Sequence, residues 1–438
     1  MSLPGGLADY VGRFLTQFYY VHGLGPVILG VCVGLAHGLL MLNMRNKHFS
    51  FRFLSFIPIA FLWIYLQNMH ALLGTGIAFV LALLTTWLLN RITRPVMHSL
   101  FSLLLVPVVY WGAGAMVWLF TAIVCAQVLT CKNRLRWPVL IVLLLLTRGM
   151  PGLAGAVCPY TVDALTSGIH YFRFSADHPT LVWLIIGLSS AVAVIPNFEI
   201  KKKTFRWALP LISLAIAVGF VFTQTKPATD DSLAYSYWGR TGQWDKIVEK
   251  ANQESPQTVV GVCMLNLALG MRGELTEKMM NYYQNSAGGL IPVVQNDFVL
   301  SPVAGEIYYQ LGMTYLAQQQ MMEAMEAFPD WQKSAYIYQR LAETNLINGA
   351  YAVSYKYLKV LQQTLFYKDW ATETLKLLGD EEAINRHPEY GRLRKMGFTE
   401  NRFFMGTFLE LLEQMNRQCP ENKLAEEYLK ACRLLTKE

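Results

Sequence analysis

The chain has 438 residues, of which 53% are hydrophobic and only 15% are charged. A soluble domain of ordinary composition carries about 25% charged residues, so this composition argues against a purely soluble protein. The net charge of +7 hides two unlike halves: residues 1–225 carry 15 Lys and Arg against 4 Asp and Glu, whereas residues 226–438 carry 22 against 26. The positive charge belongs to the apolar half, and it gives no indication of nucleic-acid binding.

Residues 1–23 predict an amphipathic helix. The segment has neither the basic start nor the apolar core of a signal peptide. We expect the helix to lie in the outer interface of a membrane. Because the chain begins like an external loop, we also hypothesise that a further helix precedes it in the natural protein. Its apolar side chains recur at helical spacing: Leu7, Tyr10, Val11, Phe14, Leu15 and Phe18.

Residues 24–225 predict a bundle of membrane-spanning helices. A helix needs roughly 17–25 mostly apolar residues to cross a bilayer core. About eight spans are expected, and the range is six to nine because residues 99–130 could form one long helix. The apolar stretches are Leu24–Asn43, Phe53–Leu66, Ala71–Leu89, Ser99–Trp111, Gly114–Thr130, Trp137–Thr147, Leu181–Pro196 and Trp207–Thr223.

The basic residues of this half predict its orientation. Loops on the cytoplasmic side of membrane helices are enriched in Lys and Arg. Four alternate connections between the predicted spans hold 12 of the 15 basic residues. The N-terminus and everything after Thr223 are therefore expected outside the cytoplasm, with the chain in the cytoplasmic (inner) membrane of a bacterial envelope.

Residues 226–438 predict a domain of helical pairs. The residues Tyr308, Leu311, Gly312, Tyr315, Ala324 and Phe328 follow a spacing that resembles the tetratricopeptide repeat, in which large and small side chains alternate so that two helices pack closely. A weaker copy begins at Tyr338 with Gly349 at its turn, and residues 237–251 predict another helix–turn–helix. An irregular helical domain is the alternative. The expected fold class is therefore all-α, a polytopic bundle followed by an extracytoplasmic, tetratricopeptide-like domain.

Tyrosines are frequent in these predicted helices. Repeats of this kind present a concave surface to peptides or proteins, and tyrosine is favoured at interfaces. Tyr308, Tyr309, Tyr338 and Tyr355 are therefore candidate binding residues. The competing interpretation is that most of these tyrosines fill the core between helices.

No nucleotide, dinucleotide, hydrolase or metal-binding motif is visible in the sequence. The seven cysteines form no framework, although Cys419 and Cys432 could bridge in an oxidising compartment. Acids, histidines and an arginine gather in the external loop of residues 148–179. They could bind a metal and a lipid phosphate, with a carboxylate as general base, or they could serve only solvation and helix capping. The candidates are Asp163, His170, Arg173, Asp177 and His178 in the loop and Asp9 near the N-terminus.

The opening residues 4–20, the apolar stretches and the Tyr-rich helices together resemble a bacterial family of polytopic membrane proteins of unknown function. The layout is also similar, more loosely, to the GT-C glycosyltransferases. These enzymes have an acidic residue in the first external loop and transfer sugars from polyprenyl-phosphate donors, and Asp9 would stand at such a position. The chain lacks the paired acidic motif of those enzymes, and layout alone is analogy at the level of fold.

The sequence therefore predicts an integral membrane protein whose external helical repeats bind another envelope protein in a scaffold or assembly role. A GT-C-like enzyme that uses a polyprenyl-phosphate lipid is the alternative, with catalysis by Asp9, Asp163, Asp177, His170 and His178. A transporter is the third possibility. No cofactor, metal or nucleic-acid partner is indicated.

Overall fold

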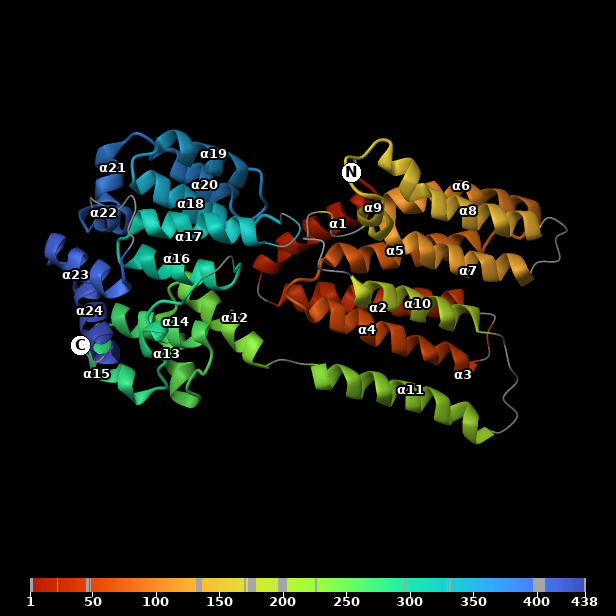
Figure 1. Ribbon diagram of the computed structural model, residues 1–438, viewed down its shortest axis with the longest axis horizontal. Coiled ribbons are helices and arrows are strands. Elements are labelled where there is room, and N and C mark those ends of the chain that lie inside the picture. The colour runs from red at the N-terminus through yellow and green to blue at the C-terminus, as the bar shows by residue number, and fades with distance from the viewer. Residues whose placement is uncertain are drawn as a thin grey trace. The chain divides into compact units, whose positions relative to one another are not determined.

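The computed structural model is all-helical, as the sequence predicts. It divides into two compact units, residues 1–225 (unit 1) and 226–438 (unit 2) (Figure 1). The prediction of an all-α fold is confirmed. The structure describes residues 3–21, 23–44, 47, 49–130, 136–168, 171, 179–195, 203–224, 227–294, 297–328, 330, 332–396 and 406–436.

Unit 1 contains one helix at each of the eight predicted apolar stretches. Five helical segments of the described residues are long and apolar enough to cross a membrane: 24–43, 49–67, 95–130, 136–155 and 207–224. Two further apolar helices, at 73–89 and 180–194, are shorter. The elements are α1 (Gly6–Thr16), α2 (Leu24–Asn43), α3 (Phe49–Arg52), α4 (Phe56–Gln67), α5 (Leu73–Leu89), α6 (Pro95–Ala113), α7 (Val117–Thr130), α8 (Arg136–Gly155), α9 (Val162–Ser167), α10 (Thr180–Val194) and α11 (Lys203–Gln224).

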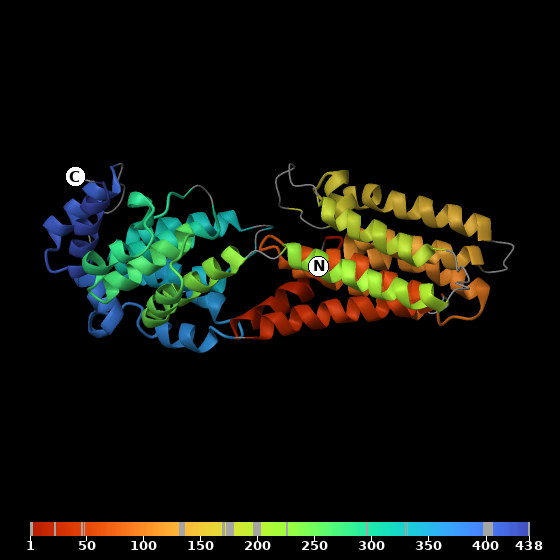
Figure 2. The same cartoon turned by 90° about the horizontal axis from the view of Figure 1, so that it is seen from below.

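Helix α5 is the centre of unit 1. It packs against α1, α2, α6 and α7, and Phe79, Ala82 and Leu83 on it are completely buried. Helix α2 lies on one side of the bundle and α8 on the other (Figure 2). Helices α2 and α11 instead leave most of their apolar side chains at least partly exposed. Long apolar helices with uncovered faces are expected where lipid, rather than protein, surrounds the bundle.

The helices of unit 1 run back and forth between two ends. Helices α1 and α9 lie at one end, and α3 lies at the other (Figure 1). At the α3 end, the Lys47 ammonium donates a hydrogen bond to the carbonyl oxygen of Ile195, which directly follows α10. The connections that follow α2 and α10 therefore meet at the same end of unit 1.

Helix α1 packs on the bundle through its small residues. Ala8 and Gly12 are buried, and a Cβ placed at Gly12 would lie only 2.5 Å from the backbone nitrogen of Gly74 in α5. Small residues permit this close approach of two helices. Leu7, Tyr10 and Phe14 lie exposed on the other side of α1. Three members of the predicted apolar pattern thus lie on the uncovered face of α1, and its close approach to α5 is made by small residues that the pattern does not include.

Three glycines join the N-terminal segment, the turn between α6 and α7, and the end of α9. Gly5, Gly114 and Gly168 all have positive φ, at 77°, 57° and 55°. A Cβ at Gly114 would lie 2.4 Å from the Gly168 carbonyl oxygen, and a Cβ at Gly5 would lie 2.5 Å from the same atom. Tyr110 and Tyr171 reinforce this glycine joint, because their hydroxyls donate to the carbonyl oxygens of Leu165 and Pro4, each at 2.8 Å.

Unit 2 is built from helices that pack mainly on their neighbours in sequence. Helix α14 is strongly apolar, is buried along nearly its whole length and forms the core of the unit. The elements are α12 (Pro227–Arg240), α13 (Trp244–Gln253), α14 (Val259–Met271), α15 (Leu275–Lys278), α16 (Leu300–Gln310), α17 (Thr314–Ala327), α18 (Ala335–Ile347), α19 (Tyr351–Leu361), α20 (Lys368–Leu375), α21 (Glu381–Arg386), α22 (Pro388–Lys395), α23 (Phe408–Gln418) and α24 (Lys423–Thr436).

One turn recurs four times in unit 2. It ends α12, α14, α16 and α18, and each copy places a glycine in the left-handed region: Gly242, Gly273, Gly312 and Gly349. In every copy the glycine N–H donates to the carbonyl three residues back, and the next N–H donates to the carbonyl five residues back. These are the two hydrogen bonds of the Schellman motif. The next helix then starts at once, so the described part of unit 2 contains four helix–glycine–helix pairs.

Candidate functional site

A pocket of about 330 Å3 opens on the surface of unit 2. Helices α12, α16 and α18 contribute to its walls, together with residues that flank α16 and α17. The lining is mostly aromatic and aliphatic, with a few polar groups, as in small-molecule and peptide sites. We call it the Arg240 pocket, and it is lined by Leu233, Ser236, Tyr237, Arg240, Phe298, Val299, Pro302, Phe328, Ser334, Tyr336 and Ile337.

Arg240 is the cation of this pocket. It is the last residue of α12, where a positive charge is favoured by the helix dipole. Its guanidinium carbon lies 5.2 Å from the ring centroid of Tyr237 and 5.0 Å from that of Tyr336, both within the range of cation–π contacts. Among the described residues no carboxylate forms an ion pair with Arg240. The pocket therefore combines apolar walls with a positive charge that has no protein anion.

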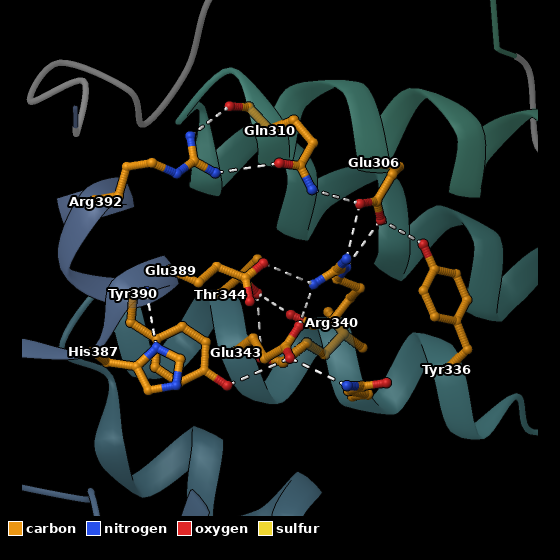
Figure 3. A network of polar contacts seen from close by, with 12 residues as sticks. Glu306, Gln310, Tyr336, Arg340, Glu343, Thr344, His387, Glu389, Tyr390 and Arg392 are labelled. Carbon is orange, nitrogen blue, oxygen red and sulfur yellow. Dashed lines mark hydrogen bonds and ion pairs between the residues drawn. The ribbon is translucent and has the colours of Figure 1, made fainter. Parts of the chain in front are cut away.

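Tyr336 forms one wall of the pocket, and its orientation is fixed by a hydrogen bond to a carboxylate in the interior of unit 2. Its hydroxyl donates a 2.8 Å hydrogen bond to Glu306 Oε2 (Figure 3). Glu306 also accepts from Gln310 Nε2 at 3.0 Å, and its side chain is only 2% exposed. A tyrosine that donates to a buried carboxylate has one well-defined orientation. The wall is therefore preorganised before any ligand arrives.

Arg340 lies at the centre of the buried polar network behind the pocket. Two of its nitrogens, Nε and Nη2, donate to the two oxygens of Glu306 at 3.0 and 2.8 Å, and Nη1 donates to Glu343 at 2.6 Å (Figure 3). The Tyr309 ring lies 4.0 Å from its guanidinium carbon. A bidentate pair of this kind is the strongest form of charged hydrogen bond in proteins. It ties α16 to α18.

Helix α22 completes the network. Arg392 donates to the side-chain and main-chain oxygens of Gln310 at 3.2 and 3.4 Å, and the Glu389 carboxylate lies 3.8 Å from Arg340. The His387 ring stacks on Tyr390 at 3.9 Å and caps the start of α22 by accepting from the Tyr390 N–H (Figure 3). Charged side chains from three helices thus meet in the interior of unit 2.

The Glu343 carboxyl of this network has a strongly perturbed pKa. Burial raises its pKa to about 7, although the adjacent Arg340 guanidinium acts in the opposite direction. Burial and the nearby Glu306 carboxylate likewise raise the pKa of Tyr336 well above its ordinary value, so that hydroxyl stays protonated and able to donate.

The raised pKa of Glu343 predicts a pH dependence of stability. The folded chain binds this proton more tightly than the unfolded chain, so the contribution of Glu343 to stability falls as pH rises from the ordinary glutamate range to about 7 and is then constant. In Glu343→Gln this loss is absent. The melting temperature of the variant, relative to the wild type, is expected to rise over that pH range and then level off.

Thermal melts of both proteins between pH 3 and 8.5 check this prediction, and Glu426→Gln is a control of opposite sign. The Lys430 ammonium, 2.7 Å from Glu426, lowers the pKa of that carboxyl. Stability conferred by Glu426 is therefore lost as pH falls. A difference between Glu343→Gln and wild type that does not change with pH would contradict the assignment.

The four tyrosines predicted to bind a partner do not share one surface patch. Tyr309 is completely buried under Arg340, and Tyr308 is largely buried against Phe408. Tyr338 packs edge-on against Tyr357 at 5.4 Å. Only Tyr355 is well exposed, at 47%. Tyr309 therefore lies in the core of unit 2, and Tyr308 packs at its edge.

The predicted acidic candidates are only partly described. Asp9 is half-buried on α1 and pairs with Arg13 at 2.9 Å. Asp163 is exposed in the first turn of α9, where a carboxylate is favoured by the helix dipole. The glycine joint brings their two segments to the same end of unit 1. His170, Arg173, Asp177 and His178 lie outside the described residues.

Two other predictions concern sulfur and metals. Cys419 directly follows α23 and Cys432 lies on α24; both are buried, and the structure does not join them in the disulfide considered from the sequence. Burial raises the pKa of the Cys419 thiol. In the described part of the chain, no group of three His, Cys, Asp or Glu side chains could hold a metal ion.

The main feature that the sequence did not reveal is the Arg240 pocket. Arg240 and Tyr237 look like ordinary polar positions at the end of an amphipathic helix, and their partners lie about a hundred residues later. One feature of the sequence could have indicated the polar network behind the pocket. Glu306 and Arg340 carry opposite charges and lie 34 residues apart, the length of one tetratricopeptide repeat, so they occupy equivalent positions on helices of successive repeats.

Comparison with known proteins agrees with one of the two resemblances drawn from the sequence. Searches of curated proteins and of solved structures found no match. The model of a family of unknown function, DUF6057, matches residues 1–438, so the resemblance to an uncharacterised family is confirmed and the chain belongs to that family.

Proposed function

We propose that this chain is an integral membrane protein of the cell envelope and that unit 2 binds a segment of a partner protein. The observation that carries the proposal is the Arg240 pocket, an apolar surface pocket with a cation that has no described protein anion. Helical pairs linked by tight turns are a scaffold on which such surfaces are commonly built. Tetratricopeptide-like character is part of this proposal.

The membrane arrangement in the proposal has about eight spans, with the N-terminus and unit 2 outside the cytoplasm of an inner membrane. Support comes from the five long apolar segments and the shorter apolar helices α5 and α10. It also comes from the basic residues Lys47, Arg52, Arg91, Arg94 and Arg136, which follow or begin helices at connections expected on one side.

The glycosyltransferase alternative gains no specific observation from the described residues. Asp9 is engaged by Arg13, and Asp163 occupies a helix N-terminus, where it is favoured for a structural reason. We therefore make no second proposal on the basis of layout.

Site-specific photocrosslinking in cells tests the proposed function. A benzoylphenylalanine residue replaces Tyr237 at the mouth of the pocket, and a second variant carries it at Met280, which is 65% exposed and does not line the pocket. We expect one protein to crosslink in stoichiometric yield at Tyr237 and not at Met280. Identical crosslinking patterns at both positions, or lipid adducts alone, would contradict partner binding at this surface.

A further inference from the structure

We propose that the Arg240 pocket binds the C-terminal residue of a polypeptide, with its carboxylate on Arg240 and its bulky apolar side chain among the pocket aromatics. This inference rests on the proposed function, because it assumes that unit 2 receives a segment of another protein. It adds the chemical class of that segment and the role of each wall.

The positive charge is the first argument. The other shielded arginines that the structure describes in unit 2 have oxygen partners: Arg272 pairs with Asp245 and Glu274, Arg340 with Glu306 and Glu343, Arg392 with Gln310, and Arg394 with Glu381 and main-chain carbonyls. Arg240 is half-buried, and among the described residues it contacts only the rings of Tyr237 and Tyr336. A guanidinium presents a planar fork of N–H donors that matches a carboxylate. Held between two rings, that fork is oriented and still open to an anion.

The size and lining of the pocket are the second argument. Its volume of about 330 Å3 is at the lower end of the range for ligand sites, so it suits one residue better than a lipid chain or an oligosaccharide. Phe298, Phe328 and Ile337 offer contacts to an apolar side chain, and Leu233 is 46% exposed at the rim. Covering such side chains is favourable in proportion to the apolar area removed from water.

The charge balance is the third argument. The pocket offers one cation, and its remaining polar groups are the hydroxyls of Ser236, Ser334 and two tyrosines. A monoanion matches this set better than a phosphate monoester, which carries nearly two charges at neutral pH and is usually held by several cationic or amide donors. A polypeptide C-terminus carries a single carboxylate and an apolar side chain on one Cα. Both parts can therefore enter a pocket that accommodates a single residue.

Two matched probes test the inference on the full chain in lipid nanodiscs. N-acetyl-phenylalanine has the free carboxylate, and N-acetyl-phenylalaninamide has the same body without the charge. Saturation-transfer NMR titrations are expected to give an affinity for the acid at least about ten-fold above that for the amide, as for a hydrogen bond to a charged group. Hexyl phosphate, as a probe for a phosphate headgroup, is expected to bind more weakly than the acid.

Substitutions assign the effect to the guanidinium. Arg240→Gln is expected to bind acid and amide equally, and Arg240→Lys, which keeps the charge and loses the fork, is expected to retain part of the preference. Arg417→Gln, at a position whose side chain is 80% exposed, is the control and should bind as the wild type does. Equal affinities of the two probes for the wild type, tighter binding of hexyl phosphate, or an acid preference that survives in Arg240→Gln would overturn the inference.

The outcome is separable from the proposed function. If the Tyr237 crosslink to a partner persists while the acid preference is absent, the partner binds without a terminal carboxylate and only this inference fails. If the acid preference is present and no protein crosslinks at Tyr237, the pocket is correctly assigned and the envelope partner is wrong.

Discussion

Arg340→Ala is expected to lower the free energy of unfolding of unit 2 by about 3–5 kcal/mol, the cost of removing one partner from a buried ion pair. The change leaves Glu306 and Glu343 without their common cation, although both side chains are almost completely buried. It also removes the group that packs on Tyr309. The loss should appear as a lower melting temperature and as faster amide hydrogen exchange in α16 and α18 of the full chain.

Two variants separate this effect from the simple loss of a positive charge. Arg386→Ala breaks an exposed pair with Glu382 and should change stability by less than about 0.5 kcal/mol. A triple variant in which Arg340, Glu306 and Glu343 all become methionine or leucine should recover most of the loss, because no buried charge is left unpaired. Full stability of Arg340→Ala would mean that the two carboxylates are solvated or protonated without cost.

Gly168→Ala is expected to disrupt the glycine joint of unit 1. Its φ of 55° is strained for any residue with a Cβ, and that Cβ would lie 2.7 Å from the Cα of Gly114 and 2.8 Å from the nitrogen of Ala115. Both neighbours are backbone atoms, which cannot rotate away as a flexible side chain would. Strain and overpacking each cost about 1–3 kcal/mol.

The measurement for Gly168→Ala is the thermal stability of the detergent-solubilised chain, followed by fluorescence-detected size exclusion. Gly149→Ala is the matched control, because its Cβ would meet nothing within 4 Å and its position lies within α8. That control should be neutral or slightly stabilising. Equal melting temperatures for the two variants would show that the end of α9 adapts freely.

The all-helical class of the chain could be predicted because long apolar runs are typical of helices that cross a membrane. Each of the eight apolar stretches became a helix, and the change of character near Thr225 coincides with the boundary between the two compact units. The repeat spacing placed Gly349 at a turn, but it included Gly312 only as one of its small residues, whereas the structure makes Gly312 the turn between α16 and α17. Gly273, which makes the same turn, lies in a stretch without that spacing and was not recognised.

The candidate site could not be predicted for a physical reason. Sequence patterns assign charged residues to solvent, because burial of a lone charge is expensive. Glu306 and Arg340 neutralise each other's charge across two helices, so both are buried although the hydrophobic pattern predicts them to be exposed. The same holds for α1, whose contact with α5 depends on Gly12 and Gly74, two residues that contribute nothing to an apolar pattern.

The glycine joint has a consequence for biosynthesis. Gly5 leaves the ribosome long before Gly168, yet the backbone carbonyl of Gly168 completes the contact that fixes the N-terminal segment. At about 5–20 residues per second, translation of the intervening chain takes on the order of 10–30 seconds. During that interval α1 lacks its final anchor while α2 to α8 are made. The earliest part of unit 1 to be made is therefore among the last to be fixed in place.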